Sequence, residues 1–145
     1  MVLKIMKVHK NAIIPHRATN GSAGMDLCAC IEEPIIIPAQ GNAIIPTGIA
    51  ISIPREYAAM IYARSGLAIK HGIGLLNSVG VIDSDYRGEI KVGLINQFNE
   101  DYEIKPNERI AQLIVHPIDL PQIMECDSLD NTQRGVGGLG STGKI

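Results

Sequence analysis

The stretch A-I-I-P-T-G-I-A-I-S-I-P-R-E-Y-A-A-M-I-Y, residues 43–62, decides the fold class of this chain. It contains three short apolar segments, Ala43–Pro46, Ile49–Ile53 and Ala58–Tyr62, which are separated by turn residues. Isoleucine is the commonest residue in the stretch, and its β-branched side chain fits a pleated strand better than a helix. The stretch therefore predicts three successive β-strands.

The same pattern continues outward in both directions. Further apolar segments between turn residues predict strands at Leu3–Val8, Ile35–Ile37, Val79–Ile82, Glu89–Asn96 and Arg109–His116. Helical periodicity is scarce, and the best helix candidate is one short turn at Ser65–Lys70, closed by Gly72. Many short strands with few helices are typical of an all-β sandwich, jelly roll or barrel.

The composition indicates one domain with an aliphatic core. The chain has 145 residues, of which 46% are hydrophobic and 19% are charged, so it can fill a core. Aromatic residues make up only 3%, with no Trp and a single Phe, so aliphatic side chains have to fill that core. Fifteen Gly and eight Pro predict many short elements joined by turns.

Charge, hydropathy and cysteine usage exclude several classes of protein. The net charge is −2 and no basic patch is visible, so we expect no nucleic-acid partner. No window approaches the ~18 consecutive apolar residues of a transmembrane helix, so we expect no membrane partner. The first ten residues also lack the unbroken apolar stretch of a signal peptide. Cys28, Cys30 and Cys126 are therefore expected to be reduced thiols in a cytoplasmic protein.

The segment D-S-D-Y-R-G, residues 83–88, is the most polar cluster beside a strongly apolar strand. On an extended chain Asp83, Asp85 and Arg87 share one face because they are two residues apart. One interpretation is a solvated hairpin end with a local ion pair. The other is a reaction site in which one aspartate acts as a general base beside a metal or phosphate.

The segment R-S-G-L-A, residues 64–68, follows a predicted strand and opens the predicted helical turn. Free N–H groups at a helix N-terminus, together with Arg64 and Ser65, suit a phosphate group. The alternative is an ordinary N-cap serine beside a surface arginine.

Two further segments carry isolated polar residues. Arg109 and Gln112, in the segment 108–113, either point into a site or are polar residues of an edge strand. Asp26 follows a turn and either belongs to a site or stabilises that turn. The histidines show no close pairing and the pair Cys28 and Cys30 has no second ligand pair, so a zinc site is not expected.

The last thirteen residues, 133–145, contain five glycines and cannot build a strand core. They form either a disordered tail or a mobile arm that becomes ordered on a phosphate, with Arg134, Ser141 and Thr142 as donors. We accordingly predict a β domain over residues 1–132 and a separate glycine-rich segment over 133–145; the family resemblance described next implies that this segment is an arm that closes over an active site.

Taken in order, these segments resemble the five motifs of the trimeric dUTPase family. The motif residues are A-G-M-D-L at 23–27, R-S-G-L-A at 64–68, G-V-I-D-S-D-Y-R-G at 80–88, E-R-I-A-Q-L at 108–113 and R-G-V-G-G-L-G-S-T-G at 134–143. The resemblance implies a jelly-roll-like distorted β-barrel (β-clip) of many short strands with one short helix. It also implies a homotrimer, in which each active site takes motifs from all three chains.

The activity implied by the resemblance is hydrolysis of dUTP to dUMP and pyrophosphate, which keeps uracil out of DNA and supplies dUMP for thymidylate synthesis. Asp83 would be the general base for in-line attack of water on the α-phosphorus. The implied cofactor is Mg²⁺, held chiefly by the triphosphate and by water, with Asp26 acting indirectly through water.

The resemblance also assigns substrate-binding residues. The implied phosphate contacts are Arg64, Ser65, Gly66 and Gln112, and the arm residues that close over the outer phosphates are Arg134, Ser141 and Thr142. The implied uracil pocket comprises the Asn77 amide, the main chain of Val81 and Ile82, and Lys91. Tyr86 would lie under the deoxyribose and exclude a 2′-hydroxyl group.

Position 139 departs from the family pattern, because Leu139 stands where the family usually has a Phe that stacks on uracil. Base–aromatic stacking contributes roughly 1–3 kcal/mol in single-strand binders, so weaker affinity or arm closure is expected. Three alternatives remain at this point: a dCTP deaminase-like enzyme of the same fold, a nucleotide-sensing regulatory protein, and a structural interaction module.

Overall fold

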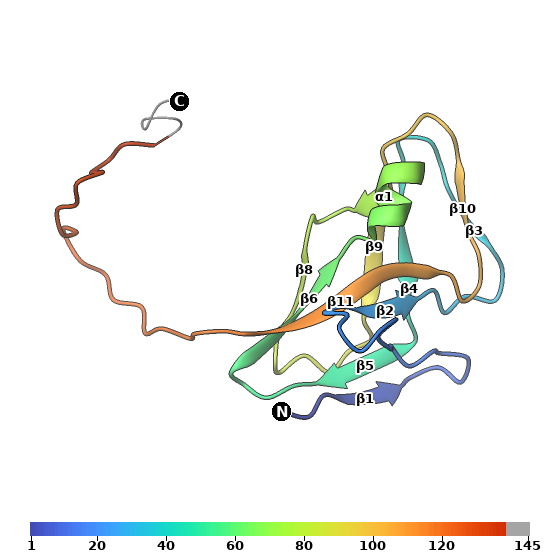
Figure 1. The fold of residues 1–145 in the computed structure, drawn as a ribbon, viewed down its shortest axis with the longest axis horizontal. Helices are drawn as coiled ribbons and strands as arrows, with labels where there is room; N and C mark the ends of the chain where they lie inside the picture. Colours follow the sequence, from blue (N-terminus) through green and yellow to red (C-terminus); the bar gives the residue numbers. More distant parts are fainter. Residues whose placement is uncertain (139–145) are drawn as a thin grey trace.

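The structure, a computed structural model, describes residues 1–138 of the chain (Figure 1). Within these residues the chain forms eleven short strands and one helix. In chain order they are β1 (Lys4–Lys7), β2 (Met25–Cys28), β3 (Ile35–Ile37), β4 (Asn42–Pro46), β5 (Ile49–Ser52), β6 (Tyr57–Tyr62), α1 (Ser65–His71), β7 (Ile73–Leu75), β8 (Gly80–Ile82), β9 (Lys91–Asn96), β10 (Tyr102–Ile104) and β11 (Arg109–Pro117). The predicted all-β class with one short helix is confirmed.

Every predicted strand is present, but β2, β7 and β10 were not predicted from the sequence pattern. Each of these three strands has only three or four residues. Asp26 in β2, Gly74 in β7 and Glu103 in β10 interrupt their apolar runs. A segment this short shows too few alternations to be recognised without its partner strand.

The strands pair antiparallel in four small sheets. The largest has the order β2-β11-β6-β8, and a second has the order β4-β9-β7. Two-stranded sheets join β1 to β5 and β10 to β3. Most of the buried side chains are aliphatic, as predicted from the composition. They include Leu27, Ile45, Leu94, Ile110 and Leu113.

Helix α1 begins and ends close to the predicted boundaries. Gly72 follows it in the left-handed conformation, with φ at 67°, and donates to the carbonyl groups of Ala68 and Leu67. A Cβ atom at position 72 would also overlap the ring of Phe98. The C-terminal end of α1 therefore requires glycine for both its backbone conformation and its packing, and the chain leaves the helix there to enter β7.

The segment after β8 turns instead of remaining extended, so the prediction that Asp83, Asp85 and Arg87 share a strand face is wrong. The backbone N–H of Tyr86 donates to the carbonyl of Asp83 at 3.2 Å, which closes a turn. The Arg87 guanidinium donates to the carbonyl groups of Ser84 and Tyr86, at 2.6 Å and 2.8 Å. These contacts to backbone carbonyls hold the turn together, and they take the place of the local ion pair in the hairpin-end interpretation.

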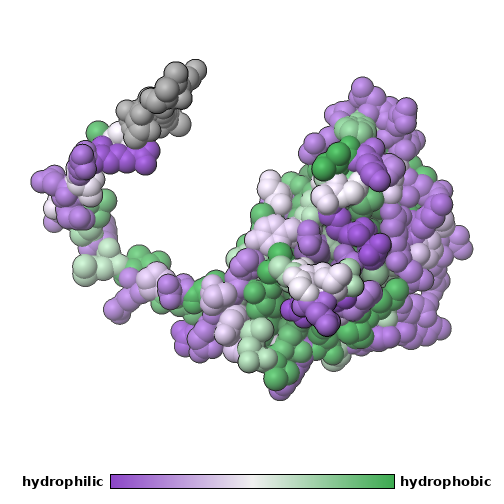
Figure 2. Space-filling view, viewed as in Figure 1, coloured by the Kyte–Doolittle hydropathy of each residue, from purple (hydrophilic) through white to green (hydrophobic). Residues whose placement is uncertain are grey.

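After β11 the chain leaves the body as an extended segment (Figure 1). Residues 118–138 contain neither a strand nor a helix. Hydrophobic residues recur among hydrophilic ones along this segment (Figure 2), and Ile123, Met124 and Leu129 are each at least 84% exposed. Exposed apolar side chains of this kind are typical of a segment that packs on another surface.

Among residues 1–138, no helix has the length and apolar character needed to cross a membrane.

Candidate active site

Two pockets lie at the two edges of the sheet β2-β11-β6-β8 and share no lining residue. The first, here called the arginine pocket, has a volume of about 360 Å³. It is lined by Ala18, Ser22, Ala23, Gly24, Asp26, Arg64, Ser65, Gly66, Arg109, Gln112 and Ile114. The second, here called the Asp83 pocket, has a volume of about 380 Å³. It is lined by Val81, Ile82, Asp83, Tyr86, Glu89, Ile90 and Lys91.

Ion pairs centred on Asp26 organise the arginine pocket. One carboxylate oxygen, Oδ1, lies 3.0 Å from Arg64 Nε, and the other, Oδ2, lies 3.1 Å from Arg109 Nη1. The Asp26 side chain is only 12% exposed and lies in β2, opposite Gln112 of β11. The alternative that Asp26 merely stabilises a turn is therefore wrong.

Arg64 is fixed at the end of β6 by a second contact, in which its Nη1 donates to the Arg109 carbonyl at 3.1 Å. Arg64 is also the N-cap of α1, with extended backbone angles, and no side chain caps the helix there. Ser65 is therefore the first helical residue, and the N-cap serine alternative is wrong. A Cβ atom at Gly66 would meet nothing within 4 Å, so the backbone there is open to the pocket.

Gln112 lies across the floor of the arginine pocket. Its Nε2 donates to the Ala63 carbonyl at 3.0 Å, which ties β11 to the segment that leads into α1. A Cβ atom at Gly24 would overlap the Gln112 carboxamide oxygen. The glycine at position 24 is therefore required for the orientation of this amide.

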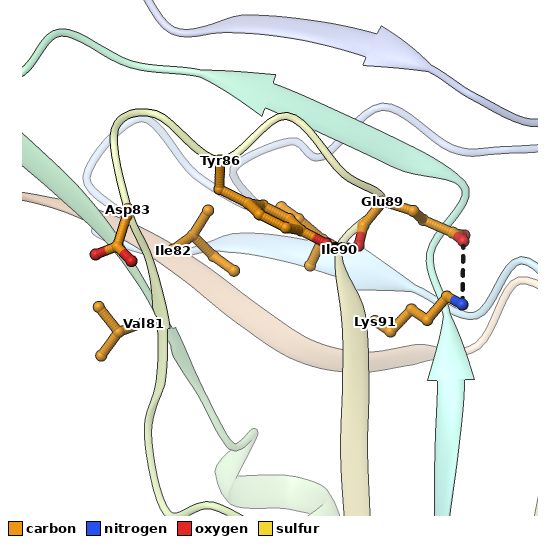
Figure 3. A pocket seen from close by; sticks show the side chains of 7 residues that line it. All are labelled: Val81, Ile82, Asp83, Tyr86, Glu89, Ile90 and Lys91. Atoms are coloured by element: carbon orange, nitrogen blue, oxygen red, sulfur yellow. Dashed lines mark hydrogen bonds and ion pairs between the residues drawn. The ribbon is translucent and has the colours of Figure 1, made fainter.

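The Asp83 pocket lies between the end of β8 and the start of β9 (Figure 3). Figure 3 shows Val81 and Asp83 directed to one side of the chain and Ile82 directed to the other. The Tyr86 hydroxyl donates to the Glu89 carbonyl at 3.0 Å, and a Cβ atom at Gly88 would overlap that hydroxyl. Glycine at position 88 thus lets the Tyr86 ring lie against its own turn.

Charged side chains in the Asp83 pocket are held loosely. Lys91 Nζ lies 4.0 Å from Glu89 Oε2, and the Lys91 side chain is 58% exposed. The other Glu89 oxygen accepts a hydrogen bond from the Gly48 N–H at 2.8 Å. Asp83 itself is exposed at the end of its strand. An exposed carboxylate of this kind can accept a proton from a bound water.

The structure does not bring every predicted site residue into these pockets. Asn77 is exposed in the turn before β8, at the opposite end of that strand from Asp83, and lines neither pocket. Arg134 lies on the extended segment, where its Nε donates to the Gly137 carbonyl at 2.9 Å. Leu139, Ser141 and Thr142 lie outside the described residues.

The sequence left open whether Arg109 points into a site or is a polar edge-strand residue, and the structure makes it part of the arginine pocket. The register of β11 shifts between Arg109 and Ala111, which marks a β-bulge at this point of the pairing with β2. Nothing local in the sequence shows this pairing, because Asp26 is 83 positions away. The one available signal is that the segments 23–27, 64–68 and 108–113 together contain two arginines, Arg64 and Arg109, and one aspartate, Asp26.

The surroundings of Cys28 and Cys30 favour the neutral thiol. Burial, followed by the charge of Asp26, raises the pKa of Cys28, which is buried in β2. Burial, followed by the charge of Glu89, raises the pKa of Cys30. Both shifts oppose thiolate formation, so neither sulfur is prepared to act as a nucleophile or a metal ligand.

Comparisons with known proteins identify relatives of this chain. Residues 10–143 match the family model described as dUTPase. A deoxyuridine 5'-triphosphate nucleotidohydrolase of Nautilia profundicola is 52% identical over 144 residues, covering 99% of this chain and 100% of that protein. The enzyme of the same name from Wolinella succinogenes is 49% identical, covering 99% of this chain and 95% of that protein.

A solved structure shows the same fold. The dUTPase of Staphylococcus bacteriophage 80alpha, determined with dUpNHpp, has a TM-score of 0.88 and 27% sequence identity. The alignment covers 98% of each chain. Together with the family match over residues 10–143, these similarities show that the chain belongs to the dUTPase family.

Proposed function

We propose that this protein hydrolyses dUTP to dUMP and pyrophosphate, and so keeps uracil out of DNA and supplies dUMP for thymidylate synthesis. The observation that carries the proposal is that the two pockets present different chemical groups. One gathers cationic and amide donors, and the other is lined by the exposed Asp83 and by Tyr86. The dUTPase family match and the relatives named for this activity support the assignment.

The arginine pocket is proposed to bind the phosphate chain. Its donors are the guanidinium group of Arg64, the open backbone at Ser65 and Gly66, and the Gln112 amide. Such donors stabilise the negative charge that accumulates as the phosphorus–oxygen bond breaks. The arm residues Arg134, Ser141 and Thr142 are proposed to close over the outer phosphates, and Leu139 over the base.

Asp83 is proposed as the general base. Its carboxylate accepts a proton from water as the water oxygen attacks the α-phosphorus in line. The bond from that phosphorus to the bridging oxygen breaks, and pyrophosphate leaves with its electron pair. The exposure of Asp83 and the absence of a direct ion pair to it among residues 1–138 suit a carboxylate that has to receive a proton.

The nucleoside is proposed to lie against the strand and turn around Asp83. The main chain of Val81 and Ile82, the Asn77 amide and Lys91 would select uracil. The Tyr86 ring, held by its bond to the Glu89 carbonyl, would lie under the deoxyribose. A rigid ring in that position excludes a 2′-hydroxyl group by contact, which discriminates against UTP.

A homotrimer with shared sites is proposed because one copy keeps the two pockets apart. The two pockets of one copy share no lining residue. A substrate that contacts both kinds of pocket would therefore bind between copies, in the arginine pocket of one copy and the Asp83 pocket of another. The apolar side chains exposed along residues 118–138 also need a surface that the same copy does not provide. The glycine-rich arm, residues 133–145, would reach a site from the end of that segment.

Mg²⁺ is proposed as the cofactor, carried chiefly by the triphosphate. Within residues 1–138 no three His, Cys, Asp or Glu side chains lie close enough together to hold a metal ion. A site with few protein carboxylates fits Mg²⁺, because this ion keeps several waters and binds substrate phosphates. When bound, the ion supplies charge neutralisation for the triphosphate. Asp26 is the single carboxylate that lines the arginine pocket, and its indirect contact through water remains a prediction.

A cytoplasmic location is also proposed, since the three cysteines are unpaired thiols. The first test of the function is product analysis with Mg²⁺ and, separately, dUTP, dTTP, dCTP and UTP. We expect dUMP and pyrophosphate from dUTP alone. Ammonia from dCTP would instead identify a deaminase, and dUTP binding without turnover would favour a regulatory role.

A further inference from the structure

We propose that Asp26 is a positioning residue that holds the guanidinium groups of Arg64 and Arg109 ready for the phosphate chain, and that it does so without a metal ion. The inference rests on the proposed function, because it concerns the phosphate end of that same site. It adds Arg109 to the phosphate-binding residues and gives Asp26 a role that is independent of Mg²⁺.

Both oxygens of Asp26 are already occupied by arginine. Oδ1 lies 3.0 Å from Arg64 Nε, and Oδ2 lies 3.1 Å from Arg109 Nη1. The two arginine residues are also joined directly, because Arg64 Nη1 donates to the Arg109 carbonyl at 3.1 Å. Each guanidinium group therefore has a fixed direction before any ligand is present.

Rigid elements hold the three residues in this arrangement. Asp26 is paired in β2, where its backbone N–H donates to the His16 carbonyl at 3.1 Å. Arg109 begins β11 beside the β-bulge, which redirects a side chain at the start of a strand. Arg64 occupies the junction between β6 and α1. Side chains supported by regular elements keep a binding geometry better than loop residues do.

The charge balance explains why a carboxylate is needed. Two guanidinium groups and one carboxylate give the pocket a net charge of +1, and its remaining lining residues are uncharged. Without Asp26 the two neighbouring cations repel each other and turn toward solvent. With Asp26 they stay together while most of their N–H donors remain free, since each guanidinium group carries five.

The Arg109 side chain is 50% exposed and that of Arg64 is 27% exposed, whereas Asp26 is only 12% exposed. A ligand that enters the pocket therefore meets the arginine side chains first, with the carboxylate behind them. This order suits an anion. It places Asp26 where it acts through the arginine residues rather than on the phosphate itself.

The test separates this role from a role in binding Mg²⁺. We would measure binding of dUpNHpp by calorimetry to the full-length protein and to Asp26→Asn, once with EDTA and once with excess Mg²⁺. The wild type should bind in EDTA. Asp26→Asn should bind about tenfold or more weakly in both conditions, because charge-assisted hydrogen bonds that orient both arginines are lost. Glu33→Gln, which removes an exposed carboxylate outside both pockets, is the matched control and should bind like the wild type.

A second variant, Arg109→Lys, keeps the inference testable if Asp26→Asn does not fold. Arg109→Lys keeps the charge but loses the planar fork that meets Asp26. It should weaken binding in EDTA by about three- to tenfold, and the Mg²⁺ concentration that gives half-maximal activity should stay unchanged.

Two results would overturn the inference. One is an Asp26→Asn protein that matches the wild type in EDTA and is weaker only with Mg²⁺, because Asp26 would then serve the metal. The other is a wild type that needs Mg²⁺ for any binding, because the preformed cationic pocket would then be insufficient. Either result leaves the proposed function intact provided that the wild type still releases dUMP and pyrophosphate from dUTP with Mg²⁺.

Discussion

The arginine pocket and the Asp83 pocket are constructed differently, although both border one sheet. In the arginine pocket, ion pairs and side-chain hydrogen bonds fix the charged and amide groups, and Asp26 is largely buried. In the Asp83 pocket the carboxylate is exposed, and the nearest lysine is held only by a 4.0 Å contact to Glu89.

Under the proposed function, this difference separates phosphate binding from reaction. Groups that bind a phosphate chain have to be oriented beforehand, since ordering them on binding costs free energy. A general base has to exchange protons with water, so a permanent ion pair at Asp83 would oppose its task. Under the proposed function, the single chain preforms the phosphate-binding pocket, and the Asp83 pocket is the one left open to a substrate.

The largest expected effect is that of Asp83→Asn, which removes the proposed general base and leaves the arginine pocket unchanged. We expect kcat for dUTP to fall by about 10²- to 10⁴-fold, because the amide cannot accept the proton from water. Binding of dUpNHpp should persist, since the arginine pocket is untouched. Steady-state kinetics measure turnover and calorimetry measures binding, with Glu33→Gln as an exposed carboxylate control. Unchanged turnover would sink the role assigned to Asp83.

Gly88→Ala tests whether the Tyr86 ring confers selectivity on the Asp83 pocket. The added methyl group overlaps the Tyr86 hydroxyl and displaces the ring from its bond to Glu89. We expect the preference for dUTP over UTP, measured as the ratio of kcat/KM values, to fall about tenfold, the scale of one steric contact. A preference equal to that of the wild type would show that Tyr86 does not exclude the 2′-hydroxyl group.

Gly24→Ala disturbs the arginine pocket by displacing the side-chain amide of Gln112. The new Cβ atom meets the Gln112 oxygen and breaks the bond from Gln112 to Ala63. We expect KM for dUTP to rise about three- to tenfold, the size of one hydrogen bond. Gly21→Ala is the matched control, because a Cβ atom there meets nothing within 4 Å. Equal KM values for the two variants would argue against a phosphate contact by Gln112.

The smallest expected effect concerns the stability contributed by Lys91. Its pair with Glu89 is long and solvent-exposed, and exposed pairs contribute about 0–1 kcal/mol. Lys91→Gln should therefore leave the free energy of unfolding within about 0.5 kcal/mol of the wild type. Denaturant unfolding measures this value, and a clearly larger loss would mean that the Asp83 pocket is more rigid than its contacts indicate.

Sequence patterns predicted the strands whose apolar residues recur over a long enough segment. They missed short strands that are recognisable only by pairing with another strand. The alternation in 91–96 is visible from the chain alone, and Val92, Leu94 and Asn96 are buried as that alternation requires. Strand β2 was missed because Asp26 is typical of a turn, and only pairing with β11 makes it a strand residue. The turn after Asp83 was missed because its hydrogen bonds come from the backbone and from Arg87, which an alternating pattern does not report.

The sequence by itself determined the strand-rich class, the position of α1 and the family, because these depend on local periodicity and on contiguous motifs such as residues 80–88. Only the tertiary structure decided that Arg109 joins Arg64 on Asp26, and that the Asp83 pocket lies apart from them. The physical reason is distance along the chain. Ion pairs and pockets form between residues that the antiparallel sheet brings together from separate segments, and no local pattern records which segments will meet.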